Sequence, residues 1–179
     1  MGRRSIPERG VLRREAGFTL IELMTVVLIL GILVAIALPT FLGAHRRAQN
    51  RAAATDLRNA VATAKVVYTD FLDYTAITVA NMAAAEPALT FLAAGTESAV
   101  GNNLGISFRV YNYGEVNMAR LSASGECYYL RTIDKQGTAP SDIPGVYYGH
   151  RPRSATFPCT GNRIASMGTS AANFPGWEG

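Results

Sequence analysis

A single carboxylate, Glu22, lies within the stretch from Phe18 to Ala44, which carries no other charged side chain. Membrane-insertion scales put an acidic residue at the middle of a bilayer at roughly 2.5–3.5 kcal/mol, and at less near the end of a helix. Breaking a buried ion pair is costly, so such a group is expected to have a partner of opposite charge. We therefore expect a cation beside Glu22, whose place in the first helical turn also suits the helix dipole.

The other reactive side chains do not form a pattern that catalysis or metal binding needs. His45 and His150 are the two histidines, and neither has a partner at catalytic or ligand spacing. The sequence contains no HExxH, GxSxG, CxxC or phosphate-binding Gly-Lys-Ser/Thr motif. Asp134, Asp142 and Glu178 are too dispersed for a calcium loop. The sequence predicts no enzymatic activity, no metal site and no cofactor.

Two cysteines, Cys127 and Cys159, lie in the C-terminal half of the chain. If that half is outside the cytoplasm, an even number of cysteines predicts one disulfide. The bond would close a loop of 31 intervening residues, which chain-entropy reasoning values at roughly 3–4 kcal/mol. The alternative is two unpaired, buried thiols.

The basic character of the chain is concentrated at its start. The 179 residues are enough for one domain with a core, and their formal net charge is +4. The first 17 residues hold five arginines and two glutamates, so the remainder has 12 basic and 11 acidic side chains. This balance does not favour a nucleic-acid-binding polypeptide.

Four more arginines follow the apolar stretch closely. They could form a DNA-binding stripe. We favour the alternative that they face lipid headgroups and acidic neighbours such as Asp56, Asp70 and Asp73. The arginines are Arg46, Arg47, Arg51 and Arg58.

The apolar stretch has three interpretations. It could be a secretory signal cut after Ala37, in the small-residue triplet Ala35-Ile36-Ala37, which would release a secreted binding protein or enzyme. It could be a plain single-pass anchor, since it is long enough to span a bilayer. In the third interpretation the chain is cut on the cytoplasmic side and keeps the apolar segment. Glu22 favours the third, because neither a signal nor a simple anchor has a use for a carboxylate.

The run Gly-Phe-Thr-Leu-Ile-Glu-Leu at residues 17–23, behind a basic leader and ahead of an apolar helix, resembles the N-terminus of type IV pilins and their pseudopilin relatives. The resemblance covers about the first 45 residues. It implies cleavage between Gly17 and Phe18 and N-methylation of Phe18 by the same peptidase. It also implies that Glu22 pairs with the terminal amine of a neighbouring subunit and so acts in assembly.

One long helix is expected from Phe18 to about Phe71, which at 1.5 Å per residue is roughly 80 Å. Pro39 removes a backbone donor and clashes with the preceding turn, so it predicts a kink. Beyond Ala44 an apolar stripe recurs at three- and four-residue spacing, which indicates an amphipathic helix that packs on a core. The stripe consists of Ala53, Leu57, Ala60, Val61, Ala64, Val67, Tyr68 and Phe71.

The rest of the chain predicts a small sheet. Residues 72–100 show little regularity apart from a short helix expected at Val79–Ala85. Three runs separated by turns, at residues 104–111, 115–123 and 127–133, predict antiparallel strands. A fourth is expected at Val146–Tyr148 in the Gly- and Pro-rich C-terminal loops. The predicted class is α+β: a long N-terminal helix, partly transmembrane, packed by its C-terminal half on a small antiparallel sheet.

The expected organisation has four parts: a cleaved leader (1–17), a transmembrane and filament-core helix (18–44), its amphipathic continuation (45–71) and a globular head (72–179). The resemblance implies a structural subunit of a helical filament of identical copies. It implies as partners a prepilin peptidase, an inner-membrane assembly platform with its ATPase, and membrane lipid before assembly. The subunit would cross the membrane once, with its N-terminus inside, and then enter a surface filament or an envelope pseudopilus. A pseudopilin of a type II secretion or DNA-uptake system remains an alternative.

Overall fold

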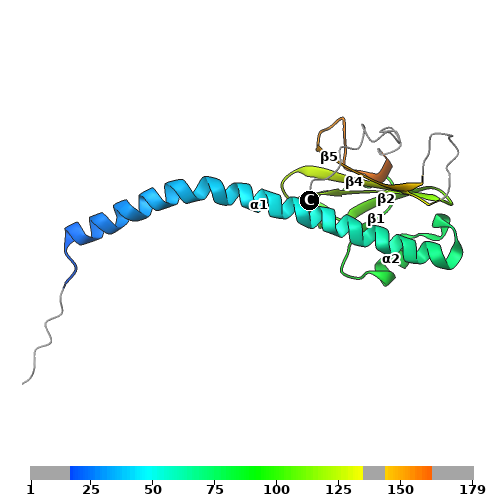
Figure 1. Cartoon of the computed structure of the whole chain (residues 1–179), viewed down its shortest axis with the longest axis horizontal. Helices are drawn as coiled ribbons and strands as arrows, with labels where there is room; N and C mark the ends of the chain where they lie inside the picture. The colour runs from blue at the N-terminus through cyan, green and yellow to red at the C-terminus, as the bar shows by residue number, and fades with distance from the viewer. Residues whose placement is uncertain (1–16, 135–143, 163–179) are drawn as a thin grey trace, which may run out of the picture. The chain divides into compact units, whose positions relative to one another are not determined.

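The computed structural model describes residues 17–134 and 144–162. Two compact units divide the chain, Met1–Leu42 and Gly43–Gly179, and helix α1 has residues in both. The observed class is α+β, as predicted. The elements are α1 (Leu20–Phe71), the 3₁₀ turn η1 (Tyr74–Ala76), α2 (Val79–Ala85), β1 (Phe91–Leu92), the 3₁₀ turn η2 (Val100–Asn102), β2 (Ile106–Asn112), β3 (Glu115–Leu121), β4 (Glu126–Ile133) and β5 (Gly145–Pro152) (Figure 1).

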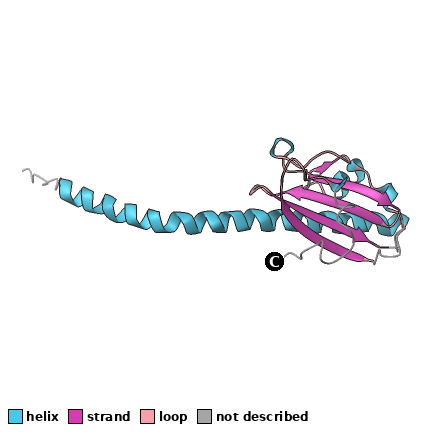
Figure 2. Cartoon of the chain, turned by 90° about the horizontal axis from the view of Figure 1, so that it is seen from above, coloured by secondary structure: helices cyan, strands magenta, loops and turns pink. Residues whose placement is uncertain are grey.

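The second half of helix α1 is amphipathic, as its sequence pattern predicts. Its buried face packs on the sheet, and Figure 2 shows this part of the helix crossing one face of the strands. Small residues dominate that face, which lets the helix backbone approach the sheet closely. The buried residues are Ala53, Ala54, Leu57, Ala60, Val61, Thr63, Ala64 and Val67.

Helix α1 ends where the backbone turns at Leu72, whose φ of 52° lies in the left-handed region. The side chain of Asp73 then caps η1, and Tyr74 returns to the core with its ring centroid 4.5 Å from that of Tyr68. Phe71 was expected in the buried stripe but is 64% exposed. The turn explains this difference, because Tyr74 fills the end of the core in its place.

The sheet has five strands in the order β1-β2-β3-β4-β5. Strand β1 pairs in parallel with β2, and the other neighbours are antiparallel. The three central strands and helix α2 lie where the sequence predicts them. Strand β1 is missing from the prediction because two residues give no readable alternation. Strand β5 is longer than Val146–Tyr148 because all eight of its residues pair with β4.

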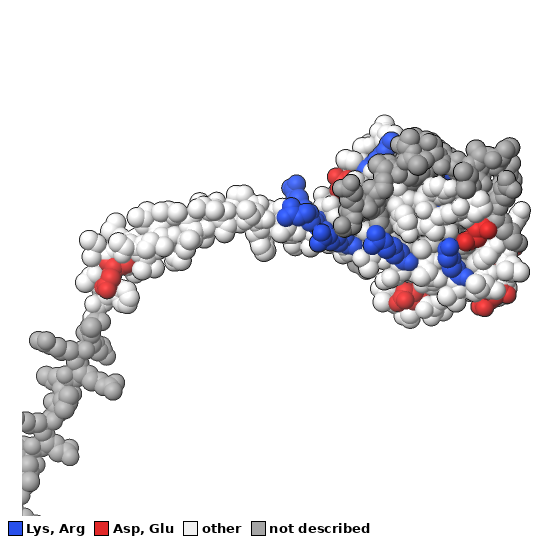
Figure 3. Space-filling model, viewed as in Figure 1, with Lys and Arg blue, Asp and Glu red and all other residues white. Residues whose placement is uncertain are grey.

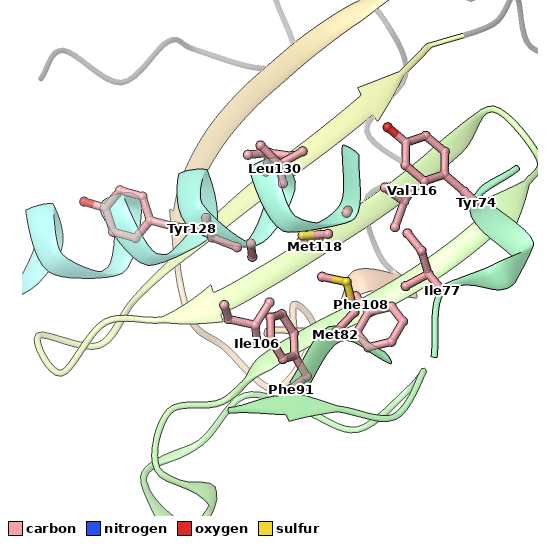
Figure 4. Close-up of a cluster of buried hydrophobic side chains, with 14 of the residues drawn as sticks. Tyr74, Ile77, Met82, Phe91, Ile106, Phe108, Val116, Met118, Tyr128 and Leu130 are labelled. Atoms are coloured by element: carbon pink, nitrogen blue, oxygen red, sulfur yellow. The ribbon is translucent and has the colours of Figure 1, made fainter. Parts of the chain in front are cut away.

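Alternate side chains of strands β3 and β4 enter different clusters. Val116 and Met118 of β3 face helix α1 and join the main core with Ile106, Phe108 and Leu130 (Figure 4). On the opposite face a smaller cluster contains Ala119, Leu121, Cys127, Tyr129 and Cys159. This opposite face also holds an ion pair between Arg131 and Glu115, with 2.8 Å between Nε and Oε1 and exposures of 7% and 5%. Removing one partner of such a buried pair typically costs about 3–5 kcal/mol.

Candidate functional site

Helix α1 begins with a reciprocal capping arrangement between Thr19 and Glu22. The Thr19 hydroxyl accepts a hydrogen bond from the Glu22 backbone N–H at 3.2 Å. In return the Glu22 carboxylate accepts from the Thr19 hydroxyl at 2.9 Å and from the Thr19 N–H at 3.3 Å. This is a capping box, in which the first side chain and the third helical side chain satisfy free backbone donors. The Thr-x-x-Glu spacing was readable in the sequence, but our sequence reasoning considered the charge of Glu22 alone.

Gly17 and Phe18 precede this helix in solvent-exposed chain without regular secondary structure. Phe18 is 79% exposed. A Cβ added at Gly17 would meet no atom within 4 Å, and its φ does not lie in the left-handed region. Nothing in the described part of the chain therefore requires glycine at position 17. The leader from residue 1 to residue 16 lies outside the described residues.

The first half of helix α1 exposes apolar side chains around its whole circumference. Such surface is rare on a protein that meets only water. By length and composition α1 can cross a membrane, although a signal sequence near the N-terminus has the same properties. Glu22 is the one charged residue on this part of the helix, and it is exposed. The large apolar side chains run from Phe18 to Leu42 with exposures between 48% and 79%.

Comparison with known proteins gives this segment a family. Residues 12–38 match the family described as the prokaryotic N-terminal methylation motif. In this N-terminal segment the chain is similar to pilins and pseudopilins. The match includes the Gly17–Phe18 junction, Glu22 and most of the apolar stretch.

Three relatives share the same segment. The type IV major pilin protein PilA of Myxococcus xanthus is 53% identical over 45 residues, which are 25% of this chain and 20% of that protein. The type II secretion system core protein G of Vibrio cholerae is 46% identical over 46 residues, 26% of this chain and 32% of that protein. The protein of the same name from Aeromonas hydrophila is 42% identical over 45 residues, with 25% and 32% covered. The chain thus spans less than a third of the length of these relatives, and no solved structure matches it.

Pro39 lies inside α1, one position beyond the residues that match the methylation motif. A proline cannot donate to the carbonyl four residues earlier, here that of Ala35. Nearby, the Thr40 hydroxyl donates to the Ala37 carbonyl at 2.8 Å. The helix is continuous through Pro39 in secondary structure, and the kink stays a prediction.

The sheet and its connections are held to α1 by polar contacts as well as by the core. Lys65 of α1 contacts Asp134 at 3.1 Å, and the Tyr74 hydroxyl donates to the same carboxylate. Burial and this hydrogen bond raise the pKa of Tyr74 above its ordinary range. Asp134 therefore anchors the helix to the end of β4. Asp142 and Glu178 lie outside the described residues, and the described residues contain no cluster of three or more His, Cys, Asp and Glu side chains.

Cys127 and Cys159 form a disulfide with 5.6 Å between their Cα atoms. We call residues 158–162, which it fixes to the sheet, the strap. The Gly161 N–H donates to the Ser107 hydroxyl at 3.2 Å, and the Cys159 N–H donates to Glu97 at 3.1 Å. A Cβ on Gly161 would lie 2.9 Å from the Arg109 nitrogen and 3.0 Å from the Asn117 carbonyl oxygen. The strap therefore lies directly on the backbones of β2 and β3.

Proposed function

We propose that this chain is a structural subunit of a type IV pilus or pilin-like filament. A prepilin peptidase cuts after Gly17 and methylates the new amine on Phe18. Its apolar segment anchors the subunit in the membrane before assembly. The subunit then polymerises with identical neighbours through helix α1. An assembly platform and its ATPase supply the work, because lipid and a helical bundle are similarly apolar and hydrophobicity alone does not drive extraction.

The observation that carries this proposal is the exposed Glu22 carboxylate at the start of a helix whose apolar side chains are themselves exposed. In a filament these side chains are covered by neighbouring helices, and Glu22 enters an apolar surrounding. The Phe18 ammonium of a neighbour then neutralises it. A pair of this kind sets the register of one subunit on the next, since either charge alone is costly to bury.

The capping box sets a condition on this mechanism. In the free chain the Glu22 carboxylate is occupied by the two donors of Thr19. To bind an ammonium as well, it must share its oxygens or give up one of these bonds. A carboxylate has about four acceptor positions, so one carboxylate can serve both the cap and the neighbour.

Substitutions at positions 22 and 19 separate the charge from the cap. Glu22→Gln keeps a side chain that closes a capping box but has no charge, and Glu22→Ala has neither. Thr19→Ala keeps the charge and removes the cap, at a cost of about 0.5–2 kcal/mol to the helix. We expect both Glu22 variants to lose most filament yield while cleavage continues, and Thr19→Ala to retain assembly.

The readout is the amount of cleaved subunit in sheared filaments relative to the envelope. Normal filament yield from Glu22→Gln would show that the charge has no role in assembly. Loss of assembly in Thr19→Ala equal to that in Glu22→Gln would assign Glu22 to capping instead.

A second candidate is a pseudopilin of a type II secretion system or a DNA-uptake machine. The two relatives named core protein G support the secretion role. The two candidate functions share the N-terminal chemistry. They differ in whether the filament extends from the cell surface. A pilus subunit is abundant in sheared surface material, whereas a pseudopilin stays in the envelope fraction, and its deletion blocks export of a secreted enzyme.

A further inference from the structure

We propose that Arg47 and Arg51, with Arg46 beside them, bind the phosphate of an anionic phospholipid headgroup where α1 leaves the membrane. The inference rests on the membrane-stored stage of the proposed function. It adds a lipid class and a binding site to that stage.

The three arginines lie within six consecutive residues of helix α1. Arg47 and Arg51 are four residues apart in helix α1, so they lie on one face with Cβ atoms about 5–6 Å apart. All three side chains are exposed. Figure 3 shows Lys and Arg side chains following one another along this part of the chain. A guanidinium presents several N–H donors in a fixed plane, which suits bidentate binding of phosphate oxygens.

Within the part of the chain that the structure describes, no ion pair is recorded for these three arginines. The residues three and four positions away from each hold no acidic side chain. Other arginines of the chain are engaged: Arg120 with Asp56, Arg131 with Glu115 and Arg153 with Glu97. Two like charges four residues apart weaken a helix rather than support it. Among the described residues, nothing therefore gives the Arg47–Arg51 pair a stabilising role, and both guanidinium groups are exposed to an approaching anion.

The place of the arginines in the sequence favours lipid over DNA. Arg46 follows the last apolar residue, Ala44, by two positions, or about 3 Å of helix axis. The headgroup layer of a bilayer is roughly 5–8 Å thick on each side, so Arg46 and Arg47 fall within it. Arg51 begins about 10 Å beyond Ala44, and its long side chain can reach back to the layer, because helical side chains tilt toward the N-terminus of their helix. With the N-terminus inside, these arginines lie on the outer side of the membrane. The positive-inside rule concerns the cytoplasmic side, so it does not account for them. Residues 18–179 carry a net charge of only +1, a weak attraction for a long polyanion.

The test uses the full chain, purified with its disulfide intact in an uncharged detergent. Fluorescent phosphatidylglycerol is titrated into the micelles, with fluorescent phosphatidylcholine as the comparison lipid. The variant is Arg47→Gln with Arg51→Gln. The matched control, Arg109→Gln with Arg151→Gln, also removes two positive charges from exposed positions, in strands β2 and β5. Arginine and glutamine have similar helix propensities, and circular dichroism checks that each protein is folded.

We expect the chain to prefer phosphatidylglycerol and the Arg47/Arg51 variant to lose about 25-fold in affinity, at about 5-fold for each arginine near the surface. The control should keep the preference within about 2-fold. No preference for phosphatidylglycerol, or an equal loss in the control, would overturn the proposal. The proposal would also be overturned if the chain bound a short duplex DNA tightly through Arg47 and Arg51 and showed no preference for phosphatidylglycerol. Since single subunits in micelles are measured, failure here leaves the filament proposal intact, and failure of assembly leaves this result unaffected.

Discussion

Arg120 of strand β3 and Asp56 of helix α1 form an ion pair across the helix–sheet interface, with 2.8 Å between Nη2 and Oδ2. Their side chains are 16% and 26% exposed. Burial lowers the pKa of the Arg120 guanidinium, and the charge of Asp56 opposes that lowering. The sequence predicts Asp56 as an acidic neighbour for the arginine run that follows the apolar stretch. In the structure Asp56 instead pairs with Arg120 of strand β3.

This pair predicts a specific loss of stability. In Asp56→Asn, Arg120 keeps its charge in a mostly buried place without a counter-ion. We expect the free energy of unfolding to fall by about 1–2 kcal/mol, less than for a fully buried pair because water still reaches both groups. Urea unfolding of the full chain in uncharged detergent measures it. Asp70→Asn, on the exposed side of the same helix, is the control and should change little; an equal loss there would rule out the pair as the cause.

The strap predicts a difference between two glycines. In Gly161→Ala the new methyl group meets three backbone atoms of β2 and β3 at 2.9–3.0 Å, and backbone cannot move aside cheaply. A loss of about 1–3 kcal/mol is expected from overpacking. Gly101→Ala adds a methyl group that meets nothing within 4 Å. Thermal unfolding of the two variants side by side checks this, and equal melting temperatures would show that the strap does not lie tightly on the sheet.

Glu97 predicts a pH dependence of the strap. Its carboxylate accepts from the Arg153 Nε at 2.6 Å and from the Cys159 N–H at 3.1 Å. The bond from Arg153, helped by the one from Cys159, lowers the pKa of Glu97 below its ordinary 4.5. The folded state therefore holds this proton more weakly than the unfolded state. The stabilisation is fully present above about pH 4.5 and is lost as the pH falls through the lowered pKa.

The measurement for Glu97 is the urea midpoint of the wild type and of Glu97→Gln at neutral pH and at successively lower pH. The wild type should be the more stable at neutral pH, and the difference should shrink with acidification. A difference that stays constant across the range would mean that the carboxylate charge contributes nothing.

Substitution of Gly17 is expected to affect cleavage of the precursor and not its folding. Because a side chain at this position meets nothing in the described chain, Gly17→Leu should fold and insert normally. The family resemblance assigns the need for glycine to the peptidase, so the variant should accumulate as an uncleaved precursor of lower gel mobility. Gly31→Ala, also free of contacts but away from the junction, should be cleaved normally. Normal cleavage of Gly17→Leu would place the cut elsewhere.

The sequence was most informative where periodicity runs for many residues. The apolar stretch, the amphipathic stripe and the three central strands all have that property. It was least informative where a contact joins residues far apart in the sequence, as between Asp56 and Arg120. Nothing in the residues around either one indicates which partner it will meet in the fold. The exposure of Phe71 depends on a turn at Leu72. Leu72 has a positive φ although it is not a glycine, so its residue type gave no reason to predict the turn. The Thr19–Glu22 box, by contrast, is a local signal that could have been found from spacing.

The most direct test of the central claim is the N-terminus of the protein in the cell. Intact mass and N-terminal sequencing are applied to the chain from cell envelopes and from sheared surface material. The filament account predicts a mature chain that begins with N-methylated Phe18 and retains the whole apolar segment. A chain that begins at Leu38 would contradict it, because cleavage after Ala37 discards Glu22 and the helix through which subunits are proposed to assemble.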